Sequence, residues 1–409
     1  MAERNSGDRA RLRSTNRRAG VSRLPRVGWC VIAAGGLALT ACSTPPPPAP
    51  SAAGPEKGYS GPSGLVAYVA NTYDQGQGFI QAVCLDNGKL GPRVPVGGQP
   101  FTIAVTPDGR TAYVANSGWD GPKAQSTITP VDLATQRPAP AIPAGLGPMG
   151  IAITPDGTRA YVADMGSFLN NQTSSMIDAN TVTPIDLINQ RPMKPIVVGP
   201  GVGAISITPD GKRALVAIDG TDRHPQSYVE ILDLATGHLG APIGVGAAPM
   251  AIAITPDGSR ALVTDTGFRP LGHLVTPINL RTNRAGRSIP VGTGPIDIVL
   301  TPNGKRAFVA NTLTDDGNSF SSQGTVSSIA LGGHTPSHAI TVPGVPQALA
   351  ITPGGRTVYE VGLEANQRSA LAPIDVATGR VGPAIQFHTN LGEVAVTKAP
   401  RGLCGSTPG

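Results

Sequence analysis

One short turn motif recurs along the whole chain and constrains the fold more than any other feature. Thr-Pro-Asp-Gly occurs four times, and degenerate copies extend the series to seven threonines: Thr106, Thr154, Thr208, Thr255, Thr301, Thr352 and Thr397. Neighbouring copies are 45 to 54 residues apart. Pro at the second position and Gly at the fourth suit a type I turn. A period of this length predicts a repeat protein, in which one small structural unit is copied along the chain.

Each turn joins two segments that have the residue pattern of β-strands. The segment before the turn alternates large and small apolar residues, as in 151–153, and the segment after it is apolar, as in 113–116. A third segment carries an Asp near its end, as in 131–135, and a short fourth segment closes the unit. Alternation with a period of two indicates strands. Four short strands per repeat are typical of the blades of a β-propeller.

The two ends of the repeat region complete each other. It opens with a second strand, 65–71, that has no first strand before it, and it closes with a lone first strand, 393–396. These strands should share one blade and close the ring, which removes the exposed strand edges of an open array. Seven first strands and seven second strands then predict an all-β, seven-bladed β-propeller. An open solenoid, the alternative, would leave two incomplete ends.

The repeated segments resemble the YVTN-type β-propeller repeat family of bacterial and archaeal surface proteins. The resemblance rests on Tyr-Val-Ala-Asn at 113–116, Ile-Ala-Ile-Thr-Pro-Asp-Gly at 151–157 and Pro-Ile-Asp-Leu at 184–187, and it extends over residues 64–402. It implies the propeller fold. It implies little about function, because these motifs are the turns and strands that build the blades.

The N-terminus has the pattern of an export signal. Residues 1–26 carry eight arginines, and the apolar stretch 27–41 that follows is uncharged. This is the order of a secretory signal peptide, and the stretch is shorter than the about 20 residues of a membrane span. Leu-Thr-Ala-Cys at 39–42 resembles the bacterial lipobox, in which the Cys is acylated and becomes the first residue of the mature protein. We therefore predict lipidation of Cys42 and a lipid-anchored, extracytoplasmic protein; an ordinary secretory signal is the alternative, and general and twin-arginine export both stay open.

These features divide the chain into four parts. We predict a lipoprotein-type signal peptide over 1–41, a Pro-rich tether over 42–63, the propeller over 64–404 and a short tail over 405–409. A Pro-rich stretch of this kind is a semi-rigid, extended spacer without a core of its own.

The formal net charge of +6 does not describe the mature protein. The chain has 32 Lys and Arg against 26 Asp and Glu, but the signal region contains eight of the arginines together with Glu3 and Asp8. From residue 42 onward, basic and acidic residues number 24 each. A neutral, exported chain argues against nucleic-acid binding, so we expect no nucleic-acid partner.

The remaining charges are unevenly placed. The loops after the second strands hold ten acidic and four basic residues, whereas the Thr-Pro-Asp-Gly turns hold four acidic and ten basic ones. The Pro-rich tether joins the propeller on the side of these turns. We therefore expect the basic turns to face the anionic membrane and the acidic loops to face outward; a ring of merely solvated charges is the alternative.

Two cysteines lie inside the predicted propeller. Cys84 falls at the end of a third strand and Cys404 follows the last first strand, so both belong to the closing blade. A disulfide between them suits an oxidising compartment, and we predict one. Two unpaired thiols are the alternative.

Candidate binding residues lie on the face where the loops after the second and fourth strands emerge. The longest insertions, 167–180 and 312–324, are on that face, and loops on a rigid scaffold are where binding usually resides. The candidates are Trp119, Asp120, Phe168, Asn170, Asp222, His224, Phe268, Arg269, His273 and Asp315. The two histidines have no recognised metal-ligand spacing, so we expect neither a metal nor a cofactor. Solvated loops without a ligand are the alternative.

The starts of the first strands should line the central channel of the propeller. The residues at these positions are Thr102, Gly150, Ala204, Ala251, Asp297, Ala348 and Glu393. Only Asp297 and Glu393 can carry charge, and they are not in neighbouring blades. We therefore expect no convergent polar cluster and assign no catalytic residue. A second polar series is expected to bond its own backbone, as Asn and Asp do in turns: Asn71, Asn116, Asp164, Asp265 and Asn311.

The sequence favours a binding function over a catalytic one. We expect a monomeric, non-catalytic scaffold, anchored by lipid, that binds a protein or a cell-envelope ligand through its variable loops. The alternative is a propeller enzyme, lactonase-like or lyase-like, with its site at the mouth of the channel. A convergent polar cluster at the mouth would favour the enzyme, and a continuous apolar patch would favour the binding protein.

Overall fold

The computed structural model describes residues 61–71, 78–117, 126–170, 173–177, 180–220, 226–267, 271–312, 323–332, 338–364 and 368–405, with 167–170 and 173–177 described by their backbone alone. The chain separates into two compact units, Met1–Leu37 and Ala38–Gly409, and every described residue belongs to the second. Within the described residues, no helix has the length and apolar character needed to cross a membrane. Cys42 and the proposed tether up to residue 60 lie outside the described residues.

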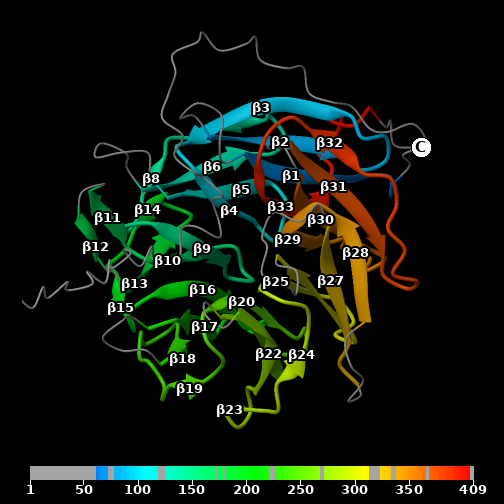
Figure 1. Ribbon diagram of the computed structural model, residues 1–409. Coiled ribbons are helices and arrows are strands. Elements are labelled where there is room, and N and C mark those ends of the chain that lie inside the picture. The colour runs from blue at the N-terminus through cyan, green and yellow to red at the C-terminus, as the bar shows by residue number, and fades with distance from the viewer. Residues whose placement is uncertain are drawn as a thin grey trace, which may run out of the picture. The chain divides into compact units, whose positions relative to one another are not determined.

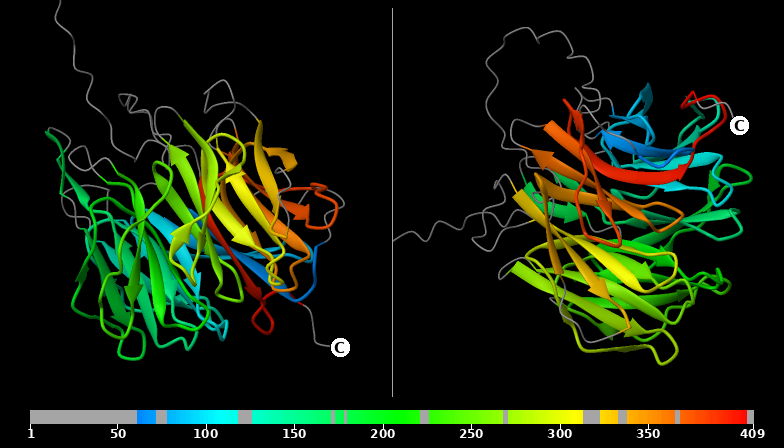
Figure 2. Two further views of the ribbon diagram at one scale, coloured as in Figure 1. Left: turned by 90° about the horizontal axis from the view of Figure 1, so that it is seen from below. Right: turned by 90° about the vertical axis from the view of Figure 1, so that its right-hand side faces the viewer.

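The described residues form an all-β, seven-bladed β-propeller, which confirms the predicted fold (Figure 1). Each blade is an antiparallel sheet whose first strand lies nearest the centre. In Figure 1 the seven innermost strands surround the centre: β4, β9, β16, β20, β25, β29 and β33. Seen from the side in Figure 2, the strands run between two faces. We call the face of the first-to-second-strand turns the turn face, and the opposite one the loop face.

The first three blades differ mainly in their outer strands. From the centre outward, blade 1 has β33 (Leu391–Lys398), β1 (Leu65–Asn71), β2 (Gly78–Cys84) and β3 (Leu90–Gly97). Blade 2 has β4 (Pro100–Val105), β5 (Thr111–Asn116), β6 (Thr127–Asp132), β7 (Arg137–Pro138) and β8 (Ile142–Pro143). Blade 3 has β9 (Pro148–Ile153), β10 (Arg159–Asp164), β13 (Thr181–Asp186), β14 (Arg191–Pro192) and β15 (Ile196–Val197). A separate hairpin pairs β11 (Ser167–Asn170) with β12 (Thr173–Ile177).

The remaining four blades follow the same plan. Blade 4 has β16 (Val202–Ile207), β17 (Arg213–Ile218), β18 (Tyr228–Asp233) and β19 (Ile243–Gly244). Blade 5 has β20 (Pro249–Ile254), β21 (Arg260–Gly267), β22 (Leu271–Asn279), β23 (Arg284–Ala285) and β24 (Ile289–Pro290). Blade 6 has β25 (Pro295–Leu300), β26 (Arg306–Asn311), β27 (Gln323–Ala330) and β28 (His338–Pro343). Blade 7 has β29 (Val345–Ile351), β30 (Thr357–Glu364), β31 (Arg368–Asp375) and β32 (Ile385–Phe387).

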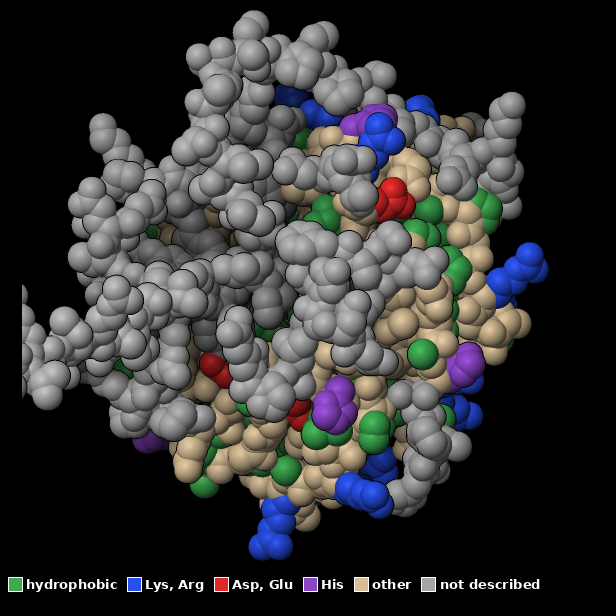
Figure 3. Space-filling view, in the orientation of Figure 1, with side chains coloured by type: hydrophobic (Ala, Val, Ile, Leu, Met, Phe, Trp, Pro, Cys, Tyr) green, Lys and Arg blue, Asp and Glu red, His purple; other side chains and the backbone are tan. Residues whose placement is uncertain are grey.

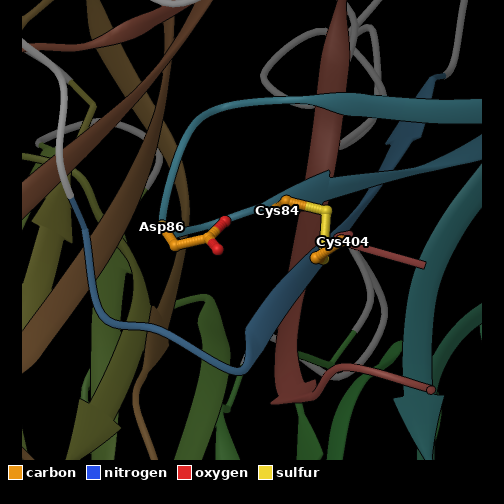
Figure 4. A group of neighbouring side chains, drawn as sticks. All are labelled: Cys84, Asp86 and Cys404. Atoms are coloured by element: carbon orange, nitrogen blue, oxygen red, sulfur yellow. A yellow bond between two sulfur atoms is a disulfide. The ribbon is translucent and has the colours of Figure 1, made fainter. Parts of the chain in front are cut away.

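The two ends of the chain close the ring in blade 1, as the sequence predicts. Strand β1 pairs antiparallel with β33, from Leu65 opposite Lys398 to Ala70 opposite Glu393. Cys84 at the end of β2 and Cys404 after β33 are joined by a disulfide, with their Cα atoms 5.5 Å apart (Figure 4). The early and late segments of the chain are therefore held together by a sheet ladder and a covalent bond.

The Thr-Pro-Asp-Gly turns are stabilised by their own side chains. In the first turn, the Thr106 hydroxyl donates to Asp108 Oδ1 at 2.6 Å, and the same oxygen accepts from the Arg110 N–H at 3.1 Å. Gly109 has a φ of 70°, a left-handed conformation that glycine adopts without strain. The hydrogen bonds from Thr106 and Arg110 lower the pKa of Asp108 below its ordinary value, so this carboxylate stays ionised at neutral pH.

The apolar core is divided among the interfaces between consecutive blades. Between blades 1 and 2, for example, Tyr68 and Ile80 of one blade pack with Val114 and Val131 of the next. All four side chains are fully buried. Burying one large aliphatic side chain contributes about 1.5–3 kcal/mol, so the packing of neighbouring blades stabilises the ring.

A polar contact near the turn face also links neighbouring blades, and two different residue types make it. In blade 3, the Tyr161 hydroxyl donates to the Leu234 carbonyl of blade 4 at 3.5 Å. In blade 4 the tyrosine is replaced by Leu215, which has no hydroxyl, and Arg213 Nη1 instead donates to the Leu280 carbonyl of blade 5 at 3.1 Å. Arginines make the corresponding contacts from blades 5 and 6.

A second set of polar contacts links the blades near the loop face and corrects one prediction. Asn116 Nδ2 donates to the Val96 carbonyl of the preceding blade at 3.0 Å and to the Thr129 hydroxyl at 2.9 Å. Asp164 accepts from the Thr183 hydroxyl and from the Gly145 N–H of the preceding blade. The prediction that such residues bond their own backbone is wrong, because their backbone groups are already paired in the sheet. Burial raises the pKa of Asp164 to about 7.

Blade 7 departs from this pattern and buries a carboxyl group instead. Gly362 stands where the Asn or Asp of other blades stands, and the Glu360 carboxyl fills the space: a Cβ on Gly362 would lie 2.7 Å from Glu360 Oε1. Glu360 is 0% exposed, and neither of its oxygens has a hydrogen-bond partner among the described residues. Burial, and to a lesser extent the nearby Glu364, raises its pKa well above the ordinary value.

Replacing Glu360 by Gln should make the protein more stable at alkaline pH. The folded state holds the Glu360 proton more tightly than the unfolded state, so the free energy of unfolding falls as pH rises above about 4.3, the ordinary pKa of Glu. We expect Glu360→Gln to raise that free energy by about 1–3 kcal/mol at pH 8 and to change it little at pH 4. Urea denaturation at both pH values measures the effect, with Glu230→Gln, at a glutamate of β18 in blade 4, as the control. An equal gain at both pH values would contradict the assignment.

Candidate active site in the central channel

Most of the predicted binding residues on the loop face lie outside the described residues. These are Trp119, Asp120, Asp222, His224, Phe268, Arg269 and Asp315. Phe168 and Asn170 lie on β11, where only the backbone is described, and His273 lies exposed on β22. The predicted binding face therefore stays a prediction.

Two carboxyl groups interact in the central channel. Asp297 is the third residue of β25 in blade 6, and Glu393 is the third residue of β33 in blade 1. Between them lies β29 of blade 7, which has Ala348 at the equivalent position. Asp297 Oδ2 accepts from the Leu349 N–H of β29, so this side chain reaches the strand that separates it from Glu393. Burial raises the pKa of Glu393, and the charge of Asp297 adds to this effect. Both residues are half-buried.

This pair corrects the expectation that no polar cluster converges in the channel. That expectation rested on the separation of Asp297 and Glu393 by one blade. Close to the axis of a propeller the first strands converge, and the intervening Ala348 contributes only a methyl group. One blade of separation is therefore too little to isolate the two carboxyl groups. In the sequence, the pair is visible as two acidic residues at a repeat position where the other five blades have an uncharged residue.

The two carboxyl groups have different hydrogen-bond partners. Asp297 Oδ1 accepts from the Ile298 N–H at 2.7 Å, and Oδ2 accepts from the Leu349 N–H of blade 7 at 2.6 Å. Glu393 Oε1 accepts from a single N–H, that of Val394, at 3.0 Å. Donors stabilise the ionised form, so the second donor favours ionisation of Asp297 over Glu393.

Burial raises the pKa of both groups. Burial raises the pKa of Asp297 to about 6. For Glu393, burial is the larger cause, and the charge of Asp297 adds to it, so the pKa lies well above its ordinary value. Because Asp297 has the second N–H donor, it is the group of the pair that ionises more readily.

A backbone irregularity precedes both residues. In every blade, the pairing of the first and second strands shifts register near the start of the first strand, as between Pro295 and Asp297 in blade 6. Such bulges change the direction of the neighbouring side chains and are common beside active sites. All seven blades thus have the bulge, but an acidic residue follows it only in blade 1 (Glu393) and blade 6 (Asp297).

Among the described residues, the only cluster of three or more His, Cys, Asp or Glu side chains with converging ligand atoms lies away from the channel, in blade 1. It consists of Cys84, Asp86 and Cys404, whose ligand atoms lie within 4.8 Å of one another (Figure 4). The two sulfur atoms are bonded to each other, so neither is a free thiolate ligand. The absence of a metal cofactor stays a prediction.

The fold and the channel pair define a seven-bladed propeller with a candidate acid–base site. No protein-family model and no curated protein matches the sequence. Among solved structures, the periplasmic gluconolactonase of Pseudomonas aeruginosa is 16% identical, with a TM-score of 0.62, and the match covers 82% of this chain and 100% of that chain. A candidate 6-phosphogluconolactonase of Bacteroides fragilis is also 16% identical, with a TM-score of 0.59 and coverage of 82% and 98%.

A third similar structure shows how widely the fold is used. The hydrazine synthase of Kuenenia stuttgartiensis is 23% identical, with a TM-score of 0.56, and the match covers 68% of this chain and 76% of that chain. Proteins named for different reactions thus share the propeller. At these identities the likeness establishes the fold, and the function must be argued from the site.

Proposed function

We propose that the chain is an extracytoplasmic lactone hydrolase whose active site is formed by Asp297 and Glu393 in the channel. The observation that carries the proposal is that two carboxyl groups line the channel with unequal donors, two N–H groups for Asp297 and one for Glu393. Catalytic acids and bases work best when their pKa lies near the operating pH, and pairs with separated pKa values mark the acid and the base. The propellers named as lactonases among the similar structures support the same reaction class.

The hydrogen-bond donors suggest a role for each residue. Asp297, the group that ionises more readily, accepts a proton from a water molecule as the water oxygen attacks the lactone carbonyl carbon. Glu393, in its protonated form, donates its proton to the ring oxygen as the bond between that oxygen and the carbonyl carbon breaks. Each lactone consumes one water molecule and yields one hydroxy acid, and a proton transfer between the two carboxyl groups or through solvent restores the starting state.

A non-catalytic binding protein, the function favoured by the sequence, is the second candidate. The β11–β12 hairpin is the observation that favours it, because this insertion lies outside the four-strand plan of the blade. The large apolar side chains that are exposed among the described residues, Leu146, Ile188, Met193 and Val197, all come from blade 3 and its entry loop. The expected protein or cell-envelope ligand and the monomeric state stay predictions.

A hydrolysis assay distinguishes the two candidates. The purified chain is mixed with D-glucono-1,5-lactone, and acid release is followed at constant pH against the spontaneous rate. We expect hydrolysis well above the spontaneous rate, and loss of that excess when both Asp297→Asn and Glu393→Gln are introduced. A rate equal to the spontaneous one, or one that the double variant retains, would favour the binding protein.

We also propose that Cys42 is acylated and anchors the protein to the outer surface of a membrane. The lipobox-like residues 39–42 support this, and the periplasmic location named for the Pseudomonas aeruginosa structure fits an exported chain. In a bacterial host, the wild-type chain should incorporate labelled palmitate and stay with the membranes after a high-salt wash, whereas Cys42→Ser should not be labelled and should be released by the salt. Equal labelling of both proteins would contradict lipidation at Cys42.

A further inference from the structure

The turn face carries a net positive charge, because its first-to-second-strand turns hold ten basic residues against four acidic ones, Asp108, Asp156, Asp210 and Asp257. Its basic residues come from all seven blades, and most are exposed: Arg110, Arg159, Lys212, Arg213, Arg260, Lys305, Arg306, Arg356, Lys398 and Arg401. Only Arg110 has a carboxylate within 4.0 Å among the described residues, its neighbour Asp108 at 3.9 Å. In the loop-face view of Figure 3, the Lys and Arg side chains that are coloured lie round the rim.

Three of these arginines are held in place by the next blade. Arg213, Arg260 and Arg306 each donate from Nη1 to a backbone carbonyl of the following blade. A carbonyl is neutral, so these bonds orient the guanidinium groups without cancelling their charge. The ring therefore has oriented arginine charges in blades 4 to 6, with Lys212 and Lys305 next to two of them in the sequence.

The described chain begins on the same face. The Gly61 N–H donates to the Asp86 carbonyl in the turn between β2 and β3, at 3.3 Å, and the Gly64 carbonyl accepts from the Ala399 N–H at 2.9 Å. The residues before 61, including Cys42, are therefore joined to the propeller at its turn face. Asp297 and Glu393 lie near the opposite ends of their strands.

We propose that the turn face binds the surface of an anionic lipid bilayer. A closed ring of separate charges matches a broad, planar anionic surface, and basic residues near such a surface attract it until salt screens them. The turns contain no aromatic residue, so they lack the stacking groups that single-stranded nucleic acids use. Binding in this orientation leaves the channel end with Asp297 and Glu393 facing away from the membrane.

The test measures lipid binding without the acyl anchor. The chain from Ser43 onward, which lacks both the acylated Cys42 and the arginine-rich residues 1–41, is sedimented with vesicles of equimolar phosphatidylglycerol and phosphatidylcholine, and with vesicles of phosphatidylcholine alone. We expect binding to the anionic vesicles only, weakened by added salt. The triple charge reversal Lys212→Glu, Lys305→Glu and Arg356→Glu should reduce it at least about tenfold. These three side chains are exposed and take no part in the arginine contacts.

A matched variant controls for net charge. Lys194→Glu, Arg287→Glu and Arg368→Glu make the same change in total charge at exposed positions outside the turn face, and this variant should keep most of the binding. Thermal unfolding of both variants checks that they fold. Equal loss in both, equal binding to neutral vesicles, or binding to heparin and duplex DNA with none to anionic vesicles would each overturn the proposal.

Discussion

Replacing Asp297 by Asn is expected to lower the rate of lactone hydrolysis by about 100- to 10,000-fold, the usual contribution of a positioned general base. Asn keeps the size of the side chain and can still accept the N–H of Leu349, but it cannot take a proton from water. In the wild-type chain, the rate should rise as pH increases through about 6, the pKa of Asp297. In Asp297→Asn, this rise should disappear. A steady-state pH profile of kcat/KM measures both effects.

Two further variants test the role of the channel pair: Glu393→Gln in the pair itself, and Asp265→Asn at a buried acid outside the channel. Gln keeps a hydrogen-bond donor but has no proton to transfer, so we expect Glu393→Gln to remove the fall in rate at alkaline pH and to lower the maximum. Asp265→Asn is the matched control. Asp265 is another buried acid, with its pKa raised by burial to about 6, but it accepts from Thr276 and Gly246 near the loop face. A comparable loss of rate in Asp265→Asn would argue against a catalytic channel pair.

Removing the Cys84–Cys404 disulfide is expected to lower the free energy of unfolding by about 3–5 kcal/mol. The bond closes a loop of 320 residues, and cross-links across long loops restrict the unfolded chain most. Urea denaturation of the wild-type chain and of the double variant Cys84→Ser, Cys404→Ser measures the difference. Reductant should lower the stability of the wild-type chain to that of the variant and leave the variant unchanged. Equal stability of the two oxidised proteins would show that the bond contributes nothing.

The fold was predictable because each repeat of the sequence contains the turn and strand residues that form one blade. Each Thr-Pro-Asp-Gly turn contains the Thr and Asp that stabilise it, so a short stretch around Thr106 specifies a hairpin without help from distant residues. The pairing of β1 with β33 followed from the incomplete repeats at the two ends. Cys84 and Cys404, placed in the same blade by that pairing, could then be matched.

The contacts between blades were not predictable in the same way. The exchange of Tyr161 for Arg213 as the donor to the next blade depends on which side chain reaches a carbonyl more than 60 residues away along the chain. The channel pair depends on the distance between first strands near the axis, which the order of residues does not contain. Asp297 and Glu393 therefore look isolated in the sequence and interact in the structure.

The shared blade has a consequence for the order in which the chain folds. A polypeptide synthesised from its N-terminus presents β1 and β2 first, while their partner β33 emerges more than 300 residues later. Until then the edge of β1 has no partner, and pairings over such a distance form slowly. Exposed strand edges promote aggregation, so an interrupted or truncated chain is most vulnerable at blade 1. Ring closure is thus the last folding step available to the chain, and the Cys84–Cys404 bond makes it hard to reverse.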